Sequence, residues 1–352
     1  MSKFHSLVVK EVTKQTSDSV SINFEIPESL KSDYKFIQGQ YITIEKEING
    51  NKIRRAYSIW KAPFQNELSV LVKQVENGLF STYANSVLKE GDILDVMVPQ
   101  GVFYPNLSSN NKKHYNLFAA GSGITPIISI AKEILHQEEN STVDLFYVNK
   151  SSDSVIFQKE LEELSANYEG KMNVYNFYSR VKQSDKLFYG RIDKDKMKKI
   201  TRKKVLKLTG DFFMCGPEQM ILDIKQFLDK NKIEKERIHF ELFTTSEPVN
   251  NQSNVSGIES AKVFLTIDDD DFEYDYKISD SDSLLDAGIS NGLDLPYSCK
   301  GGVCCTCKAK VLEGEAKMKI NYALSEEEVE EGYILTCQSH PTTPTLKVSF
   351  DD

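Results

Sequence analysis

A compact run of cysteines near the C-terminus constrains the fold of this chain more than any other feature. Cys299, Cys304, Cys305 and Cys307 lie within one short stretch, and Cys337 follows further along the chain. Without Cys305, they form the pattern C-x4-C-x2-C with a distant fourth cysteine, the spacing that holds plant-type [2Fe–2S] clusters. We therefore predict that these four cysteines, all but Cys305, are the metal ligands of an iron–sulfur cluster.

Other metal sites fit this pattern less well. A structural zinc site normally shows two C-x2-C-like pairs, whereas here the fourth cysteine stands alone. A Rieske centre needs two histidine ligands, and none of the five histidines lies in the cysteine loop. Gly301, Gly302 and Thr306 are small enough to let backbone N–H groups approach the sulfurs and offset the negative charge of the cluster. We interpret Cys305 as a packed side chain that could replace Cys304 as a ligand.

The formal charge of the chain is concentrated in the segment that contains these cysteines. Residues 261–352 have 19 acidic and 8 basic residues, a net charge of −11. The preceding 260 residues have 33 acidic and 35 basic residues, a net charge of +2. The total of −9 argues against a nucleic-acid-binding surface. The acidic segment is instead suited to steering toward basic docking surfaces.

Composition indicates a globular protein with no membrane contact. Hydrophobic residues make up 40% of the chain and aromatic residues 10%, which is too apolar for a disordered chain. No stretch approaches the ~18 apolar residues that a membrane span needs, and residues 1–5 lack the layout of a signal peptide. We therefore expect a cytoplasmic protein, in which clustered cysteines are metal ligands or redox groups more often than disulfides.

The chain divides into four segments by its hydrophobic pattern. Residues 1–107 alternate short apolar strands with turns, which predicts an antiparallel β-barrel. Residues 108–245 alternate apolar strands with helical stretches, which predicts an α/β domain with a doubly wound parallel sheet. Residues 246–259 are rich in Ser and Asn and are expected to be a flexible linker. Residues 260–352 carry the cysteine loop and form a separate domain.

Two local signals help to place elements in the last segment. Asp268–Asp271 lie between two strand-like runs, and we interpret them as a solvated hairpin turn. Ser325 and Glu328 have the spacing of a capping box, which predicts the start of a helix.

The first segment contains a strand suited to a flavin. In Arg55-Ala56-Tyr57-Ser58, the Arg55 guanidinium can pair a phosphate through a two-pronged contact. Tyr57 is two residues further on and shares the same face of the strand, where its ring can lie on a flavin. Ser58 offers a hydroxyl to the edge of the flavin.

A second flavin element follows the run that starts at Val72 and Lys73. Gly78, Ser81 and Thr82 lie at a predicted helix start and supply N–H and hydroxyl donors for a pyrophosphate. A pyrophosphate-binding element favours FAD over FMN.

The second segment contains a turn suited to a nicotinamide dinucleotide. Gly121 and Gly123, followed by Ile124, come directly after a strand and allow backbone to approach a phosphate at a helix N-terminus. We expect Thr125 to be the N-cap of that helix and Pro126 its first residue. An ordinary strand–helix turn is the alternative interpretation of so short a pattern.

Together these motifs resemble the ferredoxin–NADP reductase superfamily, with a plant-type ferredoxin domain at the C-terminus. The matching patterns are R-x-Y-S, G-x-x-S/T, G-x-G-x-T-P, and C-G-P-x-x-M at Cys215–Met220. The resemblance implies FAD bound by the first segment, NADPH or NADH bound by the second, and an α+β β-grasp fold for residues 260–352.

The resemblance also implies roles for single residues. Cys215, with Gly216 and Pro217, would lie near the nicotinamide. Ser179 and Arg180 would contact the adenosine end, where Arg180 or Arg191 can hold a 2′-phosphate, which favours NADPH. The remaining residue implied to contact cofactor is Phe243, packed by the flavin. A buried core thiol is the alternative for Cys215.

No general acid–base pair is evident in the sequence. We interpret Ser58, Cys215 and Glu218 as the residues nearest the chemistry, where they orient the rings and tune charge. A nicotinamide nucleotide delivers electrons in pairs and an iron–sulfur cluster accepts them singly, so the three cofactors together indicate a two-to-one electron converter.

The order of the domains is similar to that in reductase subunits of phenylacetyl-CoA epoxygenase complexes, over the whole length. This similarity implies a role in phenylacetate catabolism, with the di-iron site of a separate oxygenase subunit as acceptor. Reductases of other oxygenases, of flavodoxin or of hybrid-cluster proteins remain alternatives. A redox-sensing or electron-storing protein without turnover is an alternative of a different class.

We predict that Arg180→Ala raises the KM for NADPH far more than the KM for NADH, because only NADPH carries the 2′-phosphate. Steady-state kinetics with both nucleotides checks this prediction. An unchanged preference would remove Arg180 from the 2′-phosphate role.

Overall fold

The computed structural model describes residues 4–243, 258–279 and 283–351. Its contacts divide the chain into two compact units, one of His5–Phe243 and one that holds the described residues from Ile258 onward. The linker expected at 246–259 lies outside the described residues except for its last two. The boundaries expected at 107, 245 and 259 stay predictions. No helix in the described ranges is long and apolar enough to cross a membrane.

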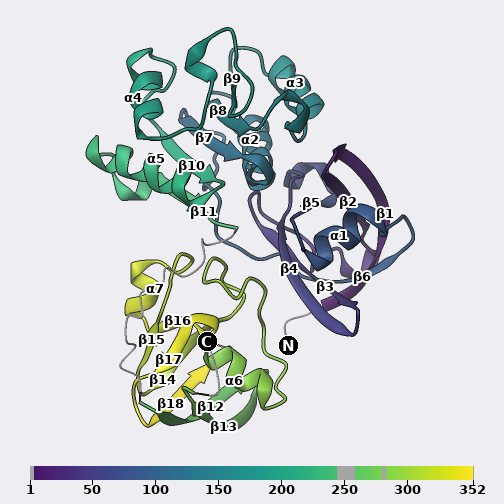
Figure 1. The fold of residues 1–352 in the computed structure, drawn as a ribbon, viewed down its shortest axis with the longest axis vertical. Helices are drawn as coiled ribbons and strands as arrows, with labels where there is room; N and C mark the ends of the chain where they lie inside the picture. Colours follow the sequence, from purple (N-terminus) through teal and green to yellow (C-terminus); the bar gives the residue numbers. More distant parts are fainter. Residues whose placement is uncertain (1–3, 244–257, 280–282, 352) are drawn as a thin grey trace. The chain divides into compact units, whose positions relative to one another are not determined.

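The chain begins with an antiparallel β-barrel, as its alternating pattern predicted (Figure 1). Its sheet has the strand order β4-β3-β6-β1-β2-β5, and a bridge between Ile59 and Val70 joins the end of β4 to β5. Ile22, Ile42 and Val96 are fully buried in its core. Its elements are β1 (Phe4–Thr16), β2 (Ser19–Glu25), η1 (Glu28–Leu30), β3 (Tyr41–Ile48), β4 (Asn51–Ser58), η2 (Pro63–Gln65), β5 (Leu68–Lys73), α1 (Leu79–Ser86) and β6 (Ile93–Met97).

A five-stranded parallel sheet follows, in the order β11-β10-β7-β8-β9. The chain winds outward from β7 to β9, then returns to β10 and β11. Because such crossovers are right-handed, the two directions place helices on opposite faces, and Figure 1 shows α2 and α3 on one side and α4 and α5 on the other. This is the predicted doubly wound fold.

The elements of this sheet are β7 (His114–Ala120), η3 (Gly121–Gly123), α2 (Ile124–Gln137), β8 (Thr142–Asn149), η4 (Ser152–Ser154), α3 (Gln158–Asn167), β9 (Met172–Tyr178), η5 (Lys186–Phe188), α4 (Lys194–Arg202), β10 (Asp211–Cys215), α5 (Glu218–Lys230), η6 (Lys235–Arg237) and β11 (Ile238–Glu241).

The barrel and the parallel sheet share one packed unit, and the single tryptophan of the chain is part of its buried core. The Trp60 ring stacks on Phe157 at 4.3 Å, and the buried Lys132 Nζ lies 4.5 Å from the centre of the Trp60 ring. Ser129 on α2 donates a hydrogen bond of 2.7 Å to the carbonyl of Lys61. Trp60 follows the predicted flavin strand by two residues, so these contacts fix that strand against α2.

The C-terminal unit is a mixed β-sheet with short helices, as expected for an α+β ferredoxin fold. The sheet order is β13-β12-β18-β14-β16, with β12 and β18 parallel, and β15 pairs separately with β17. The elements are β12 (Ser260–Ile267), β13 (Asp270–Lys277), α6 (Leu284–Ser290), β14 (Lys308–Glu313), β15 (Ala316–Met318), α7 (Glu326–Glu330), β16 (Tyr333–Leu335), η7 (Thr336–Gln338), β17 (Ser339–Pro341) and β18 (Thr345–Ser349).

The structure contains both features predicted for this unit, the capping box at Ser325 and the acidic turn at Asp268, and the turn is shorter than predicted. The capping box is confirmed, because the Ser325 hydroxyl accepts from the Glu328 N–H and the Glu328 carboxylate accepts from the Ser325 N–H. The acidic turn is shorter than predicted, since β13 already begins at Asp270. Only Asp268 and Asp269 have positive φ, at 55° and 65°, which suits the tight two-residue turn between twisted strands.

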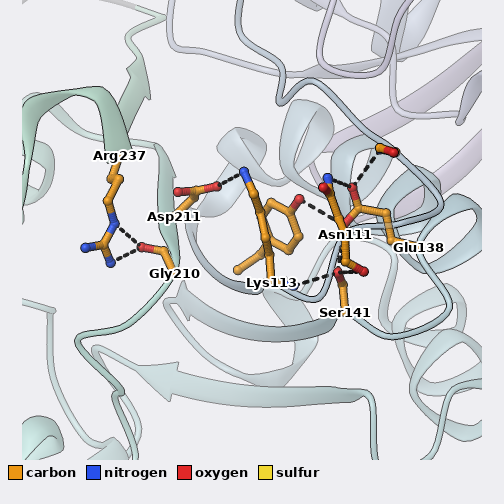
Figure 2. Close-up of polar contacts among 9 residues, drawn as sticks. Asn111, Lys113, Glu138, Ser141, Gly210, Asp211 and Arg237 are labelled. Atoms are coloured by element: carbon orange, nitrogen blue, oxygen red, sulfur yellow. Dashed lines mark hydrogen bonds and ion pairs between the residues drawn. The ribbon is translucent and has the colours of Figure 1, made fainter.

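A buried carboxylate organises the amino ends of the parallel strands (Figure 2). Glu138 is fully buried and accepts hydrogen bonds from Asn111 Nδ2 at 2.6 Å, the Ser108 N–H at 3.1 Å, the Tyr115 hydroxyl at 2.9 Å and the Ser141 hydroxyl at 2.7 Å. A buried carboxylate of this kind is stable only when its oxygens are hydrogen-bonded. Glu138 thus secures the segment that enters β7.

The same end of the sheet is held by contacts to two further strands. Lys113 pairs with Asp211 at 3.1 Å, and Arg237 Nε donates to the carbonyl of Gly210 at 2.8 Å (Figure 2). These residues lie before β7, at the start of β10 and before β11. Since ligands of open α/β sheets bind at the carboxyl ends of the strands, this network serves the fold and not a binding site.

We predict that Glu138→Ala lowers the free energy of unfolding by about 3 kcal/mol, because four buried or partly buried donors lose their acceptor. Chemical denaturation followed by circular dichroism measures the loss. The control is Glu139→Ala, which removes an exposed carboxylate next to it. Equal stability of the two variants would contradict the role of Glu138.

Candidate cofactor sites

Strand β4 presents two arginines to different environments. Arg54 is 2% exposed and its Nε contacts the Glu45 carboxylate at 2.5 Å. Arg55 lies on the opposite, exposed side, with its Nη1 donating to the carbonyl of Arg54 at 2.7 Å. The strand alternation therefore places the Arg55 guanidinium and Tyr57 on one face, where an anionic ligand is accessible to Arg55.

Helix α1 brings the second flavin element to that strand. The Phe80 ring, in the first turn of α1, lies 5.6 Å from the ring of Tyr57. Gly78 is the N-cap, and a Cβ there would lie 2.3 Å from Ser81 Oγ, so a larger residue would displace the Ser81 side chain. The first N–H groups of a helix have no acceptor within the helix. In α1 the Thr82 N–H makes the first helical hydrogen bond, to the carbonyl of Gly78, so the N–H groups before Thr82 are the ones that can face a ligand. This N-terminus, together with Arg55 on the same strand as Tyr57, fits a flavin pyrophosphate.

Some predicted flavin contacts are engaged in local bonds. The Ser81 hydroxyl accepts from the Val75 N–H at 3.2 Å and donates to the carbonyl of Gly78 at 3.3 Å. The carbonyl of Val72 accepts from Asn85 Nδ2 at 3.1 Å, which ties α1 to β5. Lys73 Nζ lies 3.6 Å from the Asp18 carboxylate. These residues shape the loop that carries the α1 N-terminus.

The nicotinamide turn differs from the sequence expectation at its helix start. Thr125 is not the N-cap, because Gly121–Gly123 form a 3₁₀ turn that runs directly into α2 at Ile124. The Thr125 hydroxyl instead donates backward to the carbonyl of Ser122 at 3.0 Å. Pro126 is the third helical residue, which is tolerated since N–H groups in the first turn have no helical acceptor.

This turn packs closely against the C-G-P motif. A Cβ on Gly123 would lie 2.3 Å from the carbonyl oxygen of Cys215, and one on Gly216 would lie 3.0 Å from Ala120 Cβ. The strands that carry the two motifs, β7 and β10, are paired, with Cys215 opposite Ala119. Glycine at 123 therefore permits the two loops to meet at the carboxyl end of the sheet.

Three polar side chains from distant segments converge beside these loops. The Ser58 hydroxyl, at the end of β4, donates to Glu241 Oε2 at 3.3 Å. Glu241 ends β11 and is the register partner of Cys215. Burial, and then the charge of Glu241, raise the pKa of the fully buried Cys215 thiol well above its ordinary value. Cys215 is thus a neutral thiol and not a nucleophile.

Sequence reasoning named Ser58 and Cys215 but passed over Glu241. It named Glu218 as the nearby carboxylate instead, and Glu218 is the partly exposed first residue of α5. The sequence did contain a signal that could have identified Glu241, because this residue ends the last parallel strand and lies two residues before the predicted flavin contact Phe243. The Phe243 ring is 38% exposed and is therefore accessible to a ligand.

The expected adenosine end is built from β8 and β9. Ser179 bonds through its N–H, at 2.9 Å, and its hydroxyl, at 3.2 Å, to the carbonyl of Asn149. The bridge between Tyr178 and Tyr189 is parallel, so Arg180 and Arg191 occupy corresponding positions two residues beyond it. Both arginines are exposed, which suits an anionic phosphate group.

The four predicted cluster ligands form a chain of neighbours. Cys299 and Cys304 sulfurs are 3.1 Å apart, and the Gly301 N–H donates to Cys299 Sγ at 3.3 Å. The Cys337 thiol contacts those of Cys299 and Cys307. Four neighbouring cysteine sulfurs are the ligand set that a [2Fe–2S] cluster needs.

The chemistry of these thiols also suits an iron–sulfur group. The adjacent Cys299 sulfur and burial raise the pKa of the Cys304 thiol well above its ordinary value. Four crowded thiolates therefore need metal cations beside them to be stable. The Cys305 sulfur is directed elsewhere, 3.6 Å from the carbonyl oxygen of Ala323.

Comparison with protein families divides the chain into three parts. Residues 6–104 match the oxidoreductase FAD-binding domain, residues 117–226 the oxidoreductase NAD-binding domain, and residues 267–342 the 2Fe-2S iron-sulfur cluster binding domain. The chain thus carries domains for FAD, a nicotinamide dinucleotide and a [2Fe–2S] cluster.

Two curated relatives match over nearly the whole chain. A subunit of the 1,2-phenylacetyl-CoA epoxidase of Escherichia coli (strain K12) is 38% identical, with 100% of this chain and 99% of the relative covered. The ferredoxin reductase component of 3-ketosteroid-9-alpha-monooxygenase from Rhodococcus rhodochrous is 32% identical, with 98% and 96% covered. Phthalate dioxygenase reductase has a similar fold, with a TM-score of 0.59, 21% identity and coverage of 99% of this chain and 98% of that chain.

We predict that Glu241→Gln lowers the rate of flavin reduction by NAD(P)H about tenfold or more, because the cofactor rings are expected beside Ser58 and Cys215, where this carboxylate would contribute to electrostatic stabilisation. FAD content should be retained. Stopped-flow absorbance compares this variant with Glu218→Gln, for which the geometry predicts a smaller loss. A larger loss for Glu218→Gln would make Glu218 the more important carboxylate.

Proposed function

The chain belongs to the family of reductases that join FAD-, NAD- and [2Fe–2S]-binding domains, and from this premise we propose that it supplies electrons to an oxygenase. It is an NAD(P)H-dependent oxidoreductase. Bound FAD would accept electrons in pairs from the nucleotide and pass them on one at a time to the cluster. The observation that carries the proposal is one chain with all three domains and relatives that match it end to end.

We propose the oxygenase component of a phenylacetyl-CoA epoxidase as the acceptor. The support is the relative of 38% identity, which is named as a subunit of that enzyme. A 3-ketosteroid monooxygenase is a second candidate, because the relative of 32% identity is named as its reductase component. Reconstitution with each purified oxygenase, followed by product formation, distinguishes the two. We also propose that the protein is cytoplasmic. With a phenylacetyl-CoA epoxidase as its acceptor, it would have a role in phenylacetate breakdown.

The proposed flavin site combines the exposed face of β4 with the N-terminus of α1. Arg55 and the first-turn N–H groups of α1 bind the pyrophosphate of FAD, and Tyr57 packs against the ring system. The full set of proposed flavin contacts is Arg55, Ala56, Tyr57, Ser58, Val72, Lys73, Gly78, Ser81, Thr82 and Phe243.

The proposed nucleotide site lies at the carboxyl ends of the parallel strands. The turn at Gly121–Gly123 holds the pyrophosphate, and the exposed Arg180 and Arg191 favour NADPH at the adenosine end. The other proposed contacts are Ile124, Thr125, Ser179, Cys215, Gly216 and Pro217. Ser58, Cys215, Glu218 and Glu241 orient the reacting rings and set the local charge, without a covalent step at the neutral Cys215 thiol.

The proposed cluster ligands are Cys299, Cys304, Cys307 and Cys337. The backbone N–H of Gly301, which already points at the Cys299 sulfur, stabilises negative charge there. We further propose three domains with boundaries at 107 and 245, and a linker up to residue 259.

We predict that Cys304→Ser abolishes NADPH-dependent cytochrome c reduction, because the Cys305 sulfur is directed at Ala323 and does not replace the lost ligand. Ferricyanide reduction should remain, because ferricyanide takes electrons from the flavin. Parallel assays on one preparation measure both activities. Cys305→Ser is the matched control, since its sulfur faces Ala323, and it should retain cytochrome c reduction. Equal loss of both activities in Cys304→Ser would contradict the proposed electron path from FAD to the cluster.

A further inference from the structure

The Tyr147 hydroxyl lies where the loops of the proposed nucleotide site meet. Tyr147 is on β8, opposite Ala119 of β7, near the carboxyl end of the sheet. Its side chain is fully buried, and its hydroxyl donates to the carbonyl of Gly121 at 3.0 Å. Gly121 begins the phosphate turn and has a φ of 54°, a conformation that glycine adopts without strain.

This hydrogen bond determines which way the turn presents its donors. In a trans peptide, the carbonyl of one residue and the N–H of the next point in opposite directions. Because the carbonyl of Gly121 points inward to Tyr147, the N–H of Ser122 points outward from the buried hydroxyl. The Gly121 carbonyl also accepts from the Ile124 N–H, so the same peptide is held at both the sheet and the helix start. An outward N–H at this turn is the donor that a pyrophosphate needs.

The strand that carries Tyr147 also leads to the adenosine side of the site. Burial raises the pKa of Tyr147, so its hydroxyl is a protonated donor at neutral pH. Asn149 lies two residues further along β8, and its carbonyl accepts both hydrogen bonds of Ser179. Strand β8 thus carries the residue that holds the phosphate turn and the residue that holds the segment leading into Arg180.

We propose that Tyr147 is a positioning residue for the nicotinamide dinucleotide, whose hydroxyl holds the Gly121–Ser122 peptide in place. The inference rests on the proposed nucleotide site. It concerns a group that NADPH and NADH share, the pyrophosphate. Loss of the hydroxyl therefore weakens both nucleotides, in contrast to loss of Arg180, which affects NADPH.

The test compares Tyr147→Phe with Tyr115→Phe in the full-length protein carrying FAD. Both changes remove one buried hydroxyl from the same parallel sheet, but Tyr115 bonds to Glu138 at the opposite end. We expect Tyr147→Phe to raise the KM for NADPH and for NADH by about five- to tenfold, the size of one buried hydrogen bond, with kcat within about twofold. Tyr115→Phe should lower thermal stability and leave both KM values unchanged.

Three results would overturn the inference: unchanged KM values in Tyr147→Phe, an equal rise in Tyr115→Phe, or a rise confined to NADPH. If Tyr147→Phe does not retain FAD, Tyr147→Met replaces it, since this change also removes the hydroxyl that bonds to the carbonyl of Gly121. It should raise both KM values in the same direction, and unchanged values would count against the inference.

Gly123→Ala separates failure of this inference from failure of the proposed site. A methyl group there would collide with the Cys215 carbonyl, so the site itself predicts a higher KM. If Gly123→Ala raises the KM and Tyr147→Phe does not, only the role of Tyr147 is wrong. If neither variant changes the KM, the nucleotide site is misplaced as well.

Discussion

The packing of the Gly123 turn against the backbone of Cys215 is the contact on which the proposed catalytic centre depends. It requires glycine, because any side chain would overlap the Cys215 carbonyl. It also requires that β7 and β10 be neighbours, although nearly a hundred residues separate them in the chain. Once the two loops meet, Cys215 and its register partner Glu241 lie together, and Ser58 reaches Glu241 from the barrel.

The two ends of the parallel sheet are built with different chemistry. At the amino ends, polar groups are hydrogen-bonded to one another. The buried Glu138 carboxylate, for example, accepts four hydrogen bonds. At the carboxyl ends, Arg180 is exposed, and the turn at Gly121–Gly123 is the proposed phosphate site. A network whose polar groups are all hydrogen-bonded stabilises a fold, whereas available donors can bind a ligand. On this division, the buried Tyr115 stabilises the fold at one end, and the buried Tyr147 is proposed to position the nucleotide at the other.

Much of this arrangement was predictable from local sequence. The antiparallel barrel, the doubly wound parallel sheet and the capping box at Ser325 were all confirmed, because each is indicated by residues close together in the chain. The N-cap at Thr125 was wrong for a related reason. A preference for threonine at a helix start was outweighed when the preceding glycines formed a 3₁₀ turn continuous with the helix.

The sequence by itself determined the cofactor set and the order of the domains, since a cysteine spacing or a glycine turn is a short-range requirement that the cofactor imposes directly on the chain. Only the tertiary structure decided that Glu241 joins Ser58 and Cys215, and that the Tyr147 hydroxyl bonds to the carbonyl of Gly121. These contacts join residues from different strands, and Ser58 and Glu241 are 183 residues apart. Strand order and register bring them together, and neither can be inferred from the spacing of residues within a motif.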